Sequence, residues 1–577
     1  MESKKWSNRR ELIALLACVL VGAVIRLWMF GSLGLTHFDE GIYAFSGAWS
    51  VTSGSVAGID PMVIPYAPAG FPILVGLNYL VLGAGDGAAI LASTFAGIAT
   101  IPLVFWLARR TFVSGAGISA AVLATLSMAH IAFSRKALTD APFLFVWTLS
   151  LTLGGRFLES PRLGRALVFG IAVGVAQNFK YNGWLTGIII ILAAAIGPVV
   201  DSESRTRTHL LRTFGFGLLA ALLAFLIYAP WYDFVERHGG YSDLVRHHRS
   251  YLSPPSAWFS NWQQQLKQAT ALSGGKVWCA AAWSLAWLSA MWAGFAGAPN
   301  RKGTRSLRIW LAGVLVGGAV VFAGIGSASW WLGWVMLPRL LQRSPATRVI
   351  AAWWLLLSIM TPFYHPYARL WLPLEACGWL ITAASIREFL ALLGSGDEAE
   401  ADEILNARPI RWIPVGVSTV FVIAVFILQP MGKPFSLSRM FQGTSSIRDG
   451  VAKLATTQVP GLSQGDEILV LGRRPISFYL AIQGRFPFRL VAGLDTLLAS
   501  GPRPRWALID SVQVTQDAGP RALPSLFERT SIRQRVWAES LDPVTLLDVR
   551  SSAAEGRNLD EMAEGWLIRI EGEAKTP

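Results

Sequence analysis

The stretch IIIILAAAIGPVV, residues 188–200, decides the class of fold. It carries no charged side chain and is too apolar to serve as a linker in water. Similar apolar runs recur along the 577 residues, and several approach the roughly 20 residues that a helix needs to cross a bilayer. The sequence therefore predicts a polytopic α-helical membrane protein.

Composition and charge agree with that class. The chain is 53% hydrophobic and only 15% charged, whereas soluble domains carry about 25% charged residues. The net charge of +14 comes from short basic segments between apolar runs, at residues 108–110, 204–212, 300–308 and 338–348. Membrane proteins collect Lys and Arg on cytoplasmic loops. Because these residues form no single basic stripe, we exclude a nucleic-acid partner.

The cysteines and the N-terminal residues indicate which kinds of site and of N-terminal segment the membrane protein has. Cys18, Cys279 and Cys377 all lie in apolar runs, which indicates neither a disulfide framework nor a zinc site. The basic segment MESKKWSNRR, residues 1–10, precedes a long apolar stretch without an A-x-A-like cleavage site. We expect a retained first span with a cytoplasmic N-terminus.

Hydropathy and the placement of Lys and Arg predict roughly 11–13 spans within a transmembrane domain. This domain covers residues 1–430, with a first outer loop at 31–86 and a second long outer loop at 231–275. An apolar piece at 68–83 is short for a span and is expected to lie on the membrane surface. Spans are predicted at residues 12–30, 87–108, 114–132, 141–157, 166–179, 184–200, 210–230, 277–297, 308–323, 325–341, 347–362, 370–389 and 411–430.

Residues 431–577 differ in character, because their apolar runs shorten to strand length. The pattern predicts a small soluble α/β domain, which the topology places outside the cytoplasm. Strands are expected at residues 467–472, 488–492, 505–510 and 544–549, with helices at 475–483 and 523–530.

Several charged residues are predicted at one boundary of the membrane, on the outer side. Ionisable residues there are costly and are by default hypotheses of a functional site. Carboxylates can accept a proton or hold a metal, and cations can hold a phosphate. Together they suggest group transfer from a lipid-phosphate carrier. The residues are Asp39, Glu40, Arg135, Lys136, Asp140, Lys180, His365 and Arg369.

Several of these residues also have a purely structural explanation. Asp39 and Glu40 could cap a helix that begins near residue 41, because carboxylates suit a helix N-terminus. Asp140 precedes Ala-Pro at the start of a span and could be an ordinary N-cap. Arg135 and Lys136 could be snorkelling anchors.

Four segments resemble motifs of the GT-C glycosyltransferases, in the branch of the protein O-mannosyltransferases and the lipid A aminoarabinose transferases. They occur in the order and on the predicted side found in that superfamily, within residues 1–430. The segments are HFDEGIYA (37–44), FSRKALTDAPFLFVWTLSL (133–151), GVAQNFKYNGWL (174–185) and YHPYARLWLPLE (364–375).

The resemblance implies an enzyme of the cell (inner or plasma) membrane that takes a sugar from a polyprenyl-phosphate donor at the outer face. Such enzymes usually invert the sugar carbon and serve a lipid, glycan or protein acceptor. Asp39 would be the catalytic carboxylate, supported by Glu40, with Asp140 as a second acidic residue. The donor phosphate would be contacted by Arg135, Lys180, Arg369, Tyr367 and His365.

The resemblance leaves the acceptor and the metal open. Where the family often has a proline pair in the first loop, this chain has YAPAGFPIL (66–74) with separated prolines. No cofactor is implied with certainty. Metal dependence varies across the superfamily, and a divalent metal could be coordinated by His37, Asp39, Glu40, Asp140 and His365.

Three other functions compete with this one. A flippase of a lipid-linked saccharide also needs boundary charges, but a transporter is expected to place them near the bilayer midplane, in broken helices. A ligase or polymerase of a surface glycan would share the topology and a lipid-linked donor. A scaffold with an outer binding domain would not need convergent acids and bases.

Overall fold

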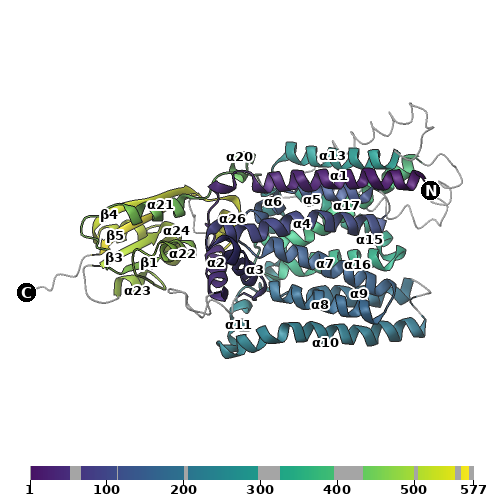
Figure 1. The fold of residues 1–577 in the computed structure, drawn as a ribbon, viewed down its shortest axis with the longest axis horizontal. Coiled ribbons are helices and arrows are strands. Elements are labelled where there is room, and N and C mark those ends of the chain that lie inside the picture. The colour runs from purple at the N-terminus through teal and green to yellow at the C-terminus, as the bar shows by residue number, and fades with distance from the viewer. Residues whose placement is uncertain are drawn as a thin grey trace, which may run out of the picture. The chain divides into compact units, whose positions relative to one another are not determined.

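A computed structural model describes most of the chain, and the predicted spans at 308–323 and 411–430 lie outside its described residues. The described residues are 2–51, 67–112, 115–200, 204, 206–295, 325–394, 433–499, 505–552 and 561–570. They form two compact units (Figure 1). The helical unit comprises Met1–Arg26, Phe95–Ile131 and Asp140–Leu437, and the sheet unit comprises Leu27–Thr94, Ala132–Thr139 and Ser438–Pro577.

Long apolar helices build most of the helical unit and lie where the hydropathy predicts spans, whereas α11 and α12 lie in the predicted second outer loop. In Figure 1, α7, α8 and α10 run side by side, and α8 packs against both of the others. The helices are α1 (Glu2–Leu27), α4 (Asp86–Phe112), α5 (Ala116–Leu126), α6 (Met128–Ser134), α7 (Asp140–Glu159), α8 (Leu163–Phe179), α9 (Leu185–Val200), α10 (Arg207–Arg237), α11 (Gly240–Arg249), α12 (Trp258–Ala271), α13 (Lys276–Phe295), α15 (Ile325–Arg343), α16 (Pro345–Met360) and α17 (Leu372–Gly394).

Length and composition support several membrane crossings. Among the described residues, five helices are long and apolar enough to span a bilayer, or up to six if the bent pair α5 and α6 forms one span. The two helices of that pair meet at 58°. Shorter apolar helices include α8 and α9. The predicted fold class, a polytopic helical membrane protein with a small C-terminal α/β region, is confirmed.

Small residues allow α8 and α10 to approach closely. A Cβ added at Gly170 would lie 2.5 Å from the carbonyl oxygen of Ala220, and one at Gly174 would lie 2.8 Å from that of Ala224. The two glycines are four residues apart, so they lie on one face of α8. This is the small-xxx-small pattern by which membrane helices pack backbone to backbone.

The sheet unit holds one five-stranded sheet with the strand order β2-β1-β3-β5-β4. The strands β1, β2 and β3 are parallel, and β5 pairs antiparallel with both β3 and β4. Apolar side chains of β1, β3 and β5, among them Leu469, Ile509 and Ile568, form its buried core. The strands are β1 (Ile468–Leu471), β2 (Phe488–Leu490), β3 (Arg505–Asp510), β4 (Thr530–Ser540) and β5 (Met562–Ile570).

The helices of the sheet unit come from two distant parts of the chain. Two belong to the predicted first outer loop, and one of them, α3, occupies the predicted apolar piece at 68–83. The others connect or flank the strands. They are α2 (Phe38–Val51), α3 (Gly70–Leu82), α20 (Leu437–Met440), α21 (Ser446–Thr456), α22 (Arg474–Gln483), α23 (Leu494–Ala499), α24 (Ser511–Ala518), α25 (Ala522–Phe527) and α26 (Pro543–Ser552).

One predicted strand is wrong. Residues 544–549 belong to the helix α26, not to a strand. The side-chain oxygen Oδ1 of Asp542 accepts the backbone N–H groups of Val544 and Thr545 at 3.1 and 3.2 Å. An Asp that caps these donors, followed by proline at the first helical position, starts a helix and outweighs the strand preference of the apolar run.

Candidate functional site

The acidic pair lies at the start of α2, and its two carboxylates have different environments. Glu40 is fully buried, whereas Asp39 is partly exposed. The backbone N–H of Asp39 donates to Nδ1 of His37 at 3.1 Å, and the backbone N–H of His37 donates to Oε2 of Glu40 at 2.9 Å. This reciprocal arrangement is a capping box with histidine as the N-cap. The capping explanation therefore describes Glu40 well.

Glu40 also ties the first loop to the segment that follows α6. Its Oε2 accepts the backbone N–H of Thr36 at 2.9 Å, and its Oε1 accepts that of Ala137 at 2.8 Å. The Nζ of Lys136 lies 3.4 Å from Oε2. A buried carboxylate with this many hydrogen-bond donors is fixed in place. The role of Glu40 in supporting a catalytic Asp39 stays a prediction.

Lys136, for which the sequence leaves a functional site and a snorkelling anchor open, lies at the centre of a buried ion cluster. Its Nζ donates to Oδ2 of Asp542 at 2.7 Å, and the same oxygen accepts the hydroxyl of Thr36 at 2.7 Å. Burial lowers the pKa of Lys136, but Asp542 and Glu40 outweigh burial and raise it above the ordinary value. Burial would raise the pKa of Asp542, yet the Lys136 ammonium holds it below the ordinary value.

A second buried cation lies between two further carboxylates of the sheet unit. Nε of Arg473 donates to Asp510 at 2.6 Å, and Nη2 donates to Glu539 at 2.9 Å. Nη1 of the same guanidinium donates to the carbonyl of Thr36 at 2.9 Å. Burial raises the pKa of Glu539 to about 7, against the opposing effect of Arg473.

In the helical unit, the structure pairs Asp140 with Lys180. Asp140 is the first residue of α7 and Lys180 follows the last residue of α8, and Nζ lies 2.5 Å from Oδ1. The ammonium also lies 5.5 Å from the ring centre of Phe143. Asp140 is 3% exposed, and no described group donates to its buried Oδ2. Two predicted site residues, Asp140 and Lys180, therefore form an ion pair through one carboxylate oxygen.

The segment 365–369 forms an aromatic site with a cation. The guanidinium of Arg369 lies over the ring of Tyr367 at 5.0 Å, and the ring of His365 lies 4.7 Å from Tyr367. The backbone N–H of His365 donates to the carbonyl of Tyr251 at 2.8 Å. The ring centres of Tyr251 and Tyr367 are 6.0 Å apart. The predicted second loop thus packs on this segment.

Aromatic contacts continue from Tyr251 toward the segment of Lys180. The rings of Tyr251 and His247 lie 5.3 Å apart, and those of His247 and His248 lie 5.4 Å apart. His248 contacts Tyr181, the neighbour of Lys180, at 5.5 Å. The sequence predicts no role for the α11 histidines, which lie in an outer loop rich in Trp, Tyr and His. Their place between two predicted motifs becomes visible only in the fold.

The remaining predicted donor contact, Arg135, belongs to the sheet unit. Its Nη1 donates to the carbonyl of Trp28 at 2.6 Å, and its guanidinium lies 5.3 Å from the ring centre of Phe441. The side chain is buried, at 5% exposure. This environment matches the structural explanation of an anchored side chain and leaves its role toward a phosphate a prediction.

The candidate metal ligands do not converge. Within the part of the chain that the structure describes, no three His, Cys, Asp or Glu side chains are arranged to hold a metal ion. His37 instead donates to Asp548, with Nε2 and Oδ2 2.9 Å apart.

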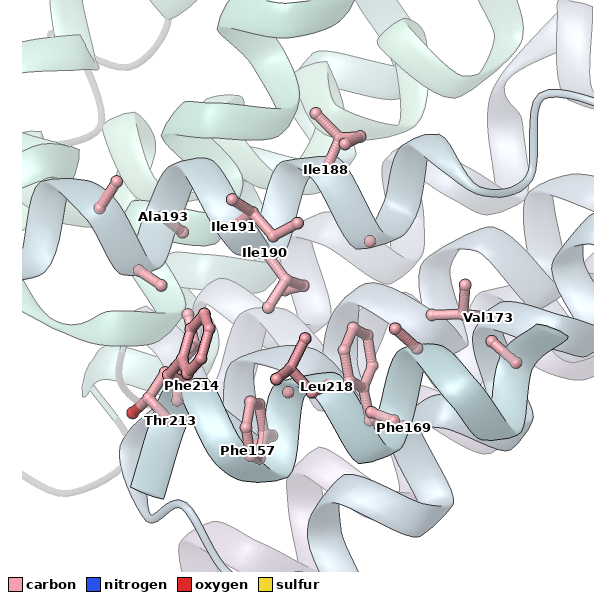
Figure 2. Close-up of a pocket in the computed structure, with 18 of the residues that line it drawn as sticks. Phe157, Phe169, Val173, Ile188, Ile190, Ile191, Ala193, Thr213, Phe214 and Leu218 are labelled. Carbon is pink, nitrogen blue, oxygen red and sulfur yellow. The ribbon is translucent and has the colours of Figure 1, made fainter. Parts of the chain in front are cut away.

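An apolar cavity of about 730 Å³ lies between α8, α9 and α10. Figure 2 shows Phe169, Val173, Ile190 and Leu218 among its lining residues. Polar groups are few, and one of them is Gln177, three residues before Lys180. A cavity of this size is in the range of ligand sites in proteins, which span about 300–1,000 Å³.

Sequence reasoning missed the residues that the C-terminal part of the chain adds to the acidic motif. Asp542 and Asp548 flank or lie within α26, and Arg473 precedes α22. The sequence offered one usable signal, the Asp-Pro pair at 542–543, which is typical of a helix start. No local signal connects these residues to the first loop.

Comparison with known proteins supports the resemblance. Residues 67–232 match the model of the family described as dolichyl-phosphate-mannose-protein mannosyltransferase. No curated protein matches the chain by sequence. The family match confirms the resemblance to GT-C glycosyltransferases that the motifs predict.

Solved structures of two such proteins are similar to the chain over most of its length. ArnT from Cupriavidus metallidurans, in a crystal structure bound to undecaprenyl phosphate, is 17% identical, with 97% of each chain covered and a TM-score of 0.47. Its apo crystal structure gives 16% identity, 99% and 98% coverage and a TM-score of 0.46. AglB from Archaeoglobus fulgidus, an oligosaccharyltransferase in complex with an inhibitory peptide and a dolichol-phosphate, is 13% identical, with 83% and 64% coverage and a TM-score of 0.43.

Proposed function

We propose, from the premise that this multi-pass membrane chain is a GT-C glycosyltransferase, that it moves a sugar from a polyprenyl-phosphate donor to an acceptor at the outer face of the cell membrane. The N-terminus would be cytoplasmic, and the sheet unit would face the periplasm or the exterior. The acceptor would be a lipid, a glycan or a protein. The family match over residues 67–232 supports the class of reaction.

The observation that carries the proposal is the contrast between the two neighbouring carboxylates. Glu40 is buried and holds backbone donors, whereas Asp39, one residue earlier, is partly exposed. A general base must reach the proton that it abstracts. Asp39 therefore takes the role of base, and Glu40 fixes the turn that presents it.

The donor phosphate would be held by cations of the helical unit. Lys180 already contacts one carboxylate oxygen of Asp140, and Arg369 lies over Tyr367. The cavity beside α8 offers apolar walls, which a prenyl chain requires (Figure 2). His365 and Tyr367 would complete the contacts to the donor.

The reaction would be a single displacement with inversion. Asp39 accepts the proton of the acceptor hydroxyl, whose oxygen attacks the anomeric carbon of the sugar. The bond from that carbon to the phosphate oxygen breaks, and polyprenyl phosphate leaves with the electron pair. A fixed cation lowers the barrier because it stabilises the negative charge that develops on the leaving phosphate.

The test uses the purified full chain in lipid with radiolabelled polyprenyl-phosphate mannose, glucose and aminoarabinose, and a membrane extract as acceptor. We expect wild type to transfer label from one donor and Asp39→Asn to lose at least a hundredfold in kcat, since general bases contribute about 10²–10⁴-fold. The exposed Asp495, on α23, provides the control Asp495→Asn.

Three outcomes would count against the proposal. Transfer that survives Asp39→Asn would remove Asp39 from the site. Transfer of a complete glycan, rather than a single sugar, would favour the ligase or polymerase. Movement of donor across liposomes without consumption would favour the flippase.

A further inference from the structure

We propose that Asp548 is a positioning residue for the reaction, which acts on the catalytic Asp39 through the imidazole of His37. The inference rests on the proposed function, because it concerns the carboxylate assigned there as the base. It gives the C-terminal helix α26 a part in the active site.

The hydrogen bonds define the tautomer of His37. A backbone N–H can only donate, so Nδ1, which lies 3.1 Å from the N atom of Asp39, accepts. The proton of the neutral ring is therefore on Nε2, which donates to Oδ2 of Asp548 at 2.9 Å. His37 is 5% exposed and Asp548 is also 5% exposed. The imidazole is held at both nitrogens in a buried site.

This ring fixes the first turn of α2. Helix starts leave N–H groups without partners, and a side-chain acceptor at the N-cap satisfies one of them. Here the satisfied N–H belongs to Asp39 itself. The orientation of the His37 ring therefore determines the position of the backbone that carries the Asp39 carboxylate. A carboxylate that orients a histidine by hydrogen bonding is a common device in catalytic and metal sites.

The helix that carries Asp548 is anchored on the same motif. Asp542 caps the start of α26 with Oδ1, while its Oδ2 accepts from Lys136 and from Thr36. Thr36 directly precedes His37. Buried hydrogen bonds therefore join α26 to the first loop at two places, from Asp542 to Thr36 and from Asp548 to His37. They give the imidazole of His37 a rigid support.

A positioning role differs from a purely structural one in what a variant changes. If Asp548 orients the base, its loss reduces kcat and leaves the KM for the donor unchanged, because the proposed donor cations Lys180 and Arg369 belong to the helical unit and Asp548 to the sheet unit. Because Asp548 acts through His37, removing both residues should cost no more than removing His37 alone.

The experiment compares Asp548→Ala, Asp548→Asn, His37→Ala, His37→Asn and the double alanine variant, with Asp495→Asn as the control. Each full-length variant is assayed for kcat and KM, and hydrogen exchange is followed in the peptide that covers residues 37–45. We expect Asp548→Ala to lower kcat at least tenfold with faster exchange of this peptide.

The two asparagine variants should retain much of the function that the alanine variants lose. Asparagine at 548 still offers an oxygen to Nε2–H, and asparagine at 37 is a strong N-cap whose oxygen can accept the N–H of Asp39. We expect both to retain more than a third of the wild-type kcat. The double alanine variant should match His37→Ala within a factor of two.

Several results would overturn the inference. Unchanged exchange in Asp548→Ala would show that Asp548 does not hold the turn. Faster exchange with unchanged kcat, or additive losses in the double variant, would show that the contact is structural only. If wild type transfers no sugar, the proposed function fails, and with it the catalytic part of the inference, whereas the exchange data still decide whether Asp548 holds the Asp39 turn.

Discussion

At the scale of single residues, the pair of Lys180 and Asp140 allows donor binding to be separated from stability. Lys180→Met would leave a buried carboxylate without its cation, and such a loss typically costs about 3–5 kcal/mol. We expect this variant to be less stable and to bind donor at least tenfold more weakly. In the double variant Lys180→Met with Asp140→Asn, stability should return but donor affinity should not.

Thermal unfolding and donor KM measure the two effects separately. Lys180→Arg serves as the matched control, because it keeps the charge beside Asp140. If the double variant regained donor affinity, Lys180 would serve only to neutralise Asp140, and the phosphate would be held elsewhere.

Residue chemistry was predictable where the signal is local, and not where it depends on the fold. Asp39, Asp140 and Lys180 stand out from the sequence because charges beside apolar runs are costly. Asp548 does not stand out, because its proposed role depends on a hydrogen bond to His37, which lies more than 500 positions away on the chain. The role of Lys136 is equally hard to predict. A lysine that anchors a span at the membrane surface and a lysine at the centre of a buried ion cluster have the same sequence context.

At the scale of elements, the close contact of α8 and α10 predicts a strong effect of a single methyl group. Gly170→Ala would place a Cβ 2.5 Å from the carbonyl oxygen of Ala220, so the helices must separate. Overpacking of this kind costs about 1–3 kcal/mol. We expect a lower melting temperature in detergent. Gly164→Ala, on the same helix, meets nothing within 4 Å and should melt like wild type; equal losses in both variants would contradict the packing argument.

The elements themselves were predictable to different degrees. Continuous apolar runs fix the helices of the helical unit, because a bilayer imposes their length. In the sheet unit, short apolar runs are ambiguous between strand and helix. The helix start at Asp542–Pro543 makes residues 544–549 helical. The strand β4 (Thr530–Ser540) is not predicted, because its apolar residues are few and charged residues interrupt them.

At the scale of the whole molecule, the buried charges of the sheet unit predict how its stability depends on pH. Burial raises the pKa of Glu539 from its ordinary 4.5 to about 7. Between these two values the folded state holds a proton that the unfolded chain releases, so stability falls as pH rises. Asp542 has the opposite sign, because Lys136 outweighs burial and lowers its pKa below the ordinary 3.8. Its contribution is present above pH 3.8 and is lost at lower pH.

Glu539→Gln separates these two effects, because glutamine resembles the protonated form at every pH. The rise of the Glu539 pKa from 4.5 to about 7 corresponds to roughly 3 kcal/mol. We expect wild type to exchange amide hydrogens of β4 and β5 faster, relative to the intrinsic rate, at pH 7.5 than at pH 5. In Glu539→Gln this difference should largely disappear. The exposed Glu528 provides the control Glu528→Gln, which should keep the wild-type pH dependence. The same pH dependence in both variants would mean that Glu539 stays ionised in the fold, and that Arg473 neutralises it more effectively than burial opposes it.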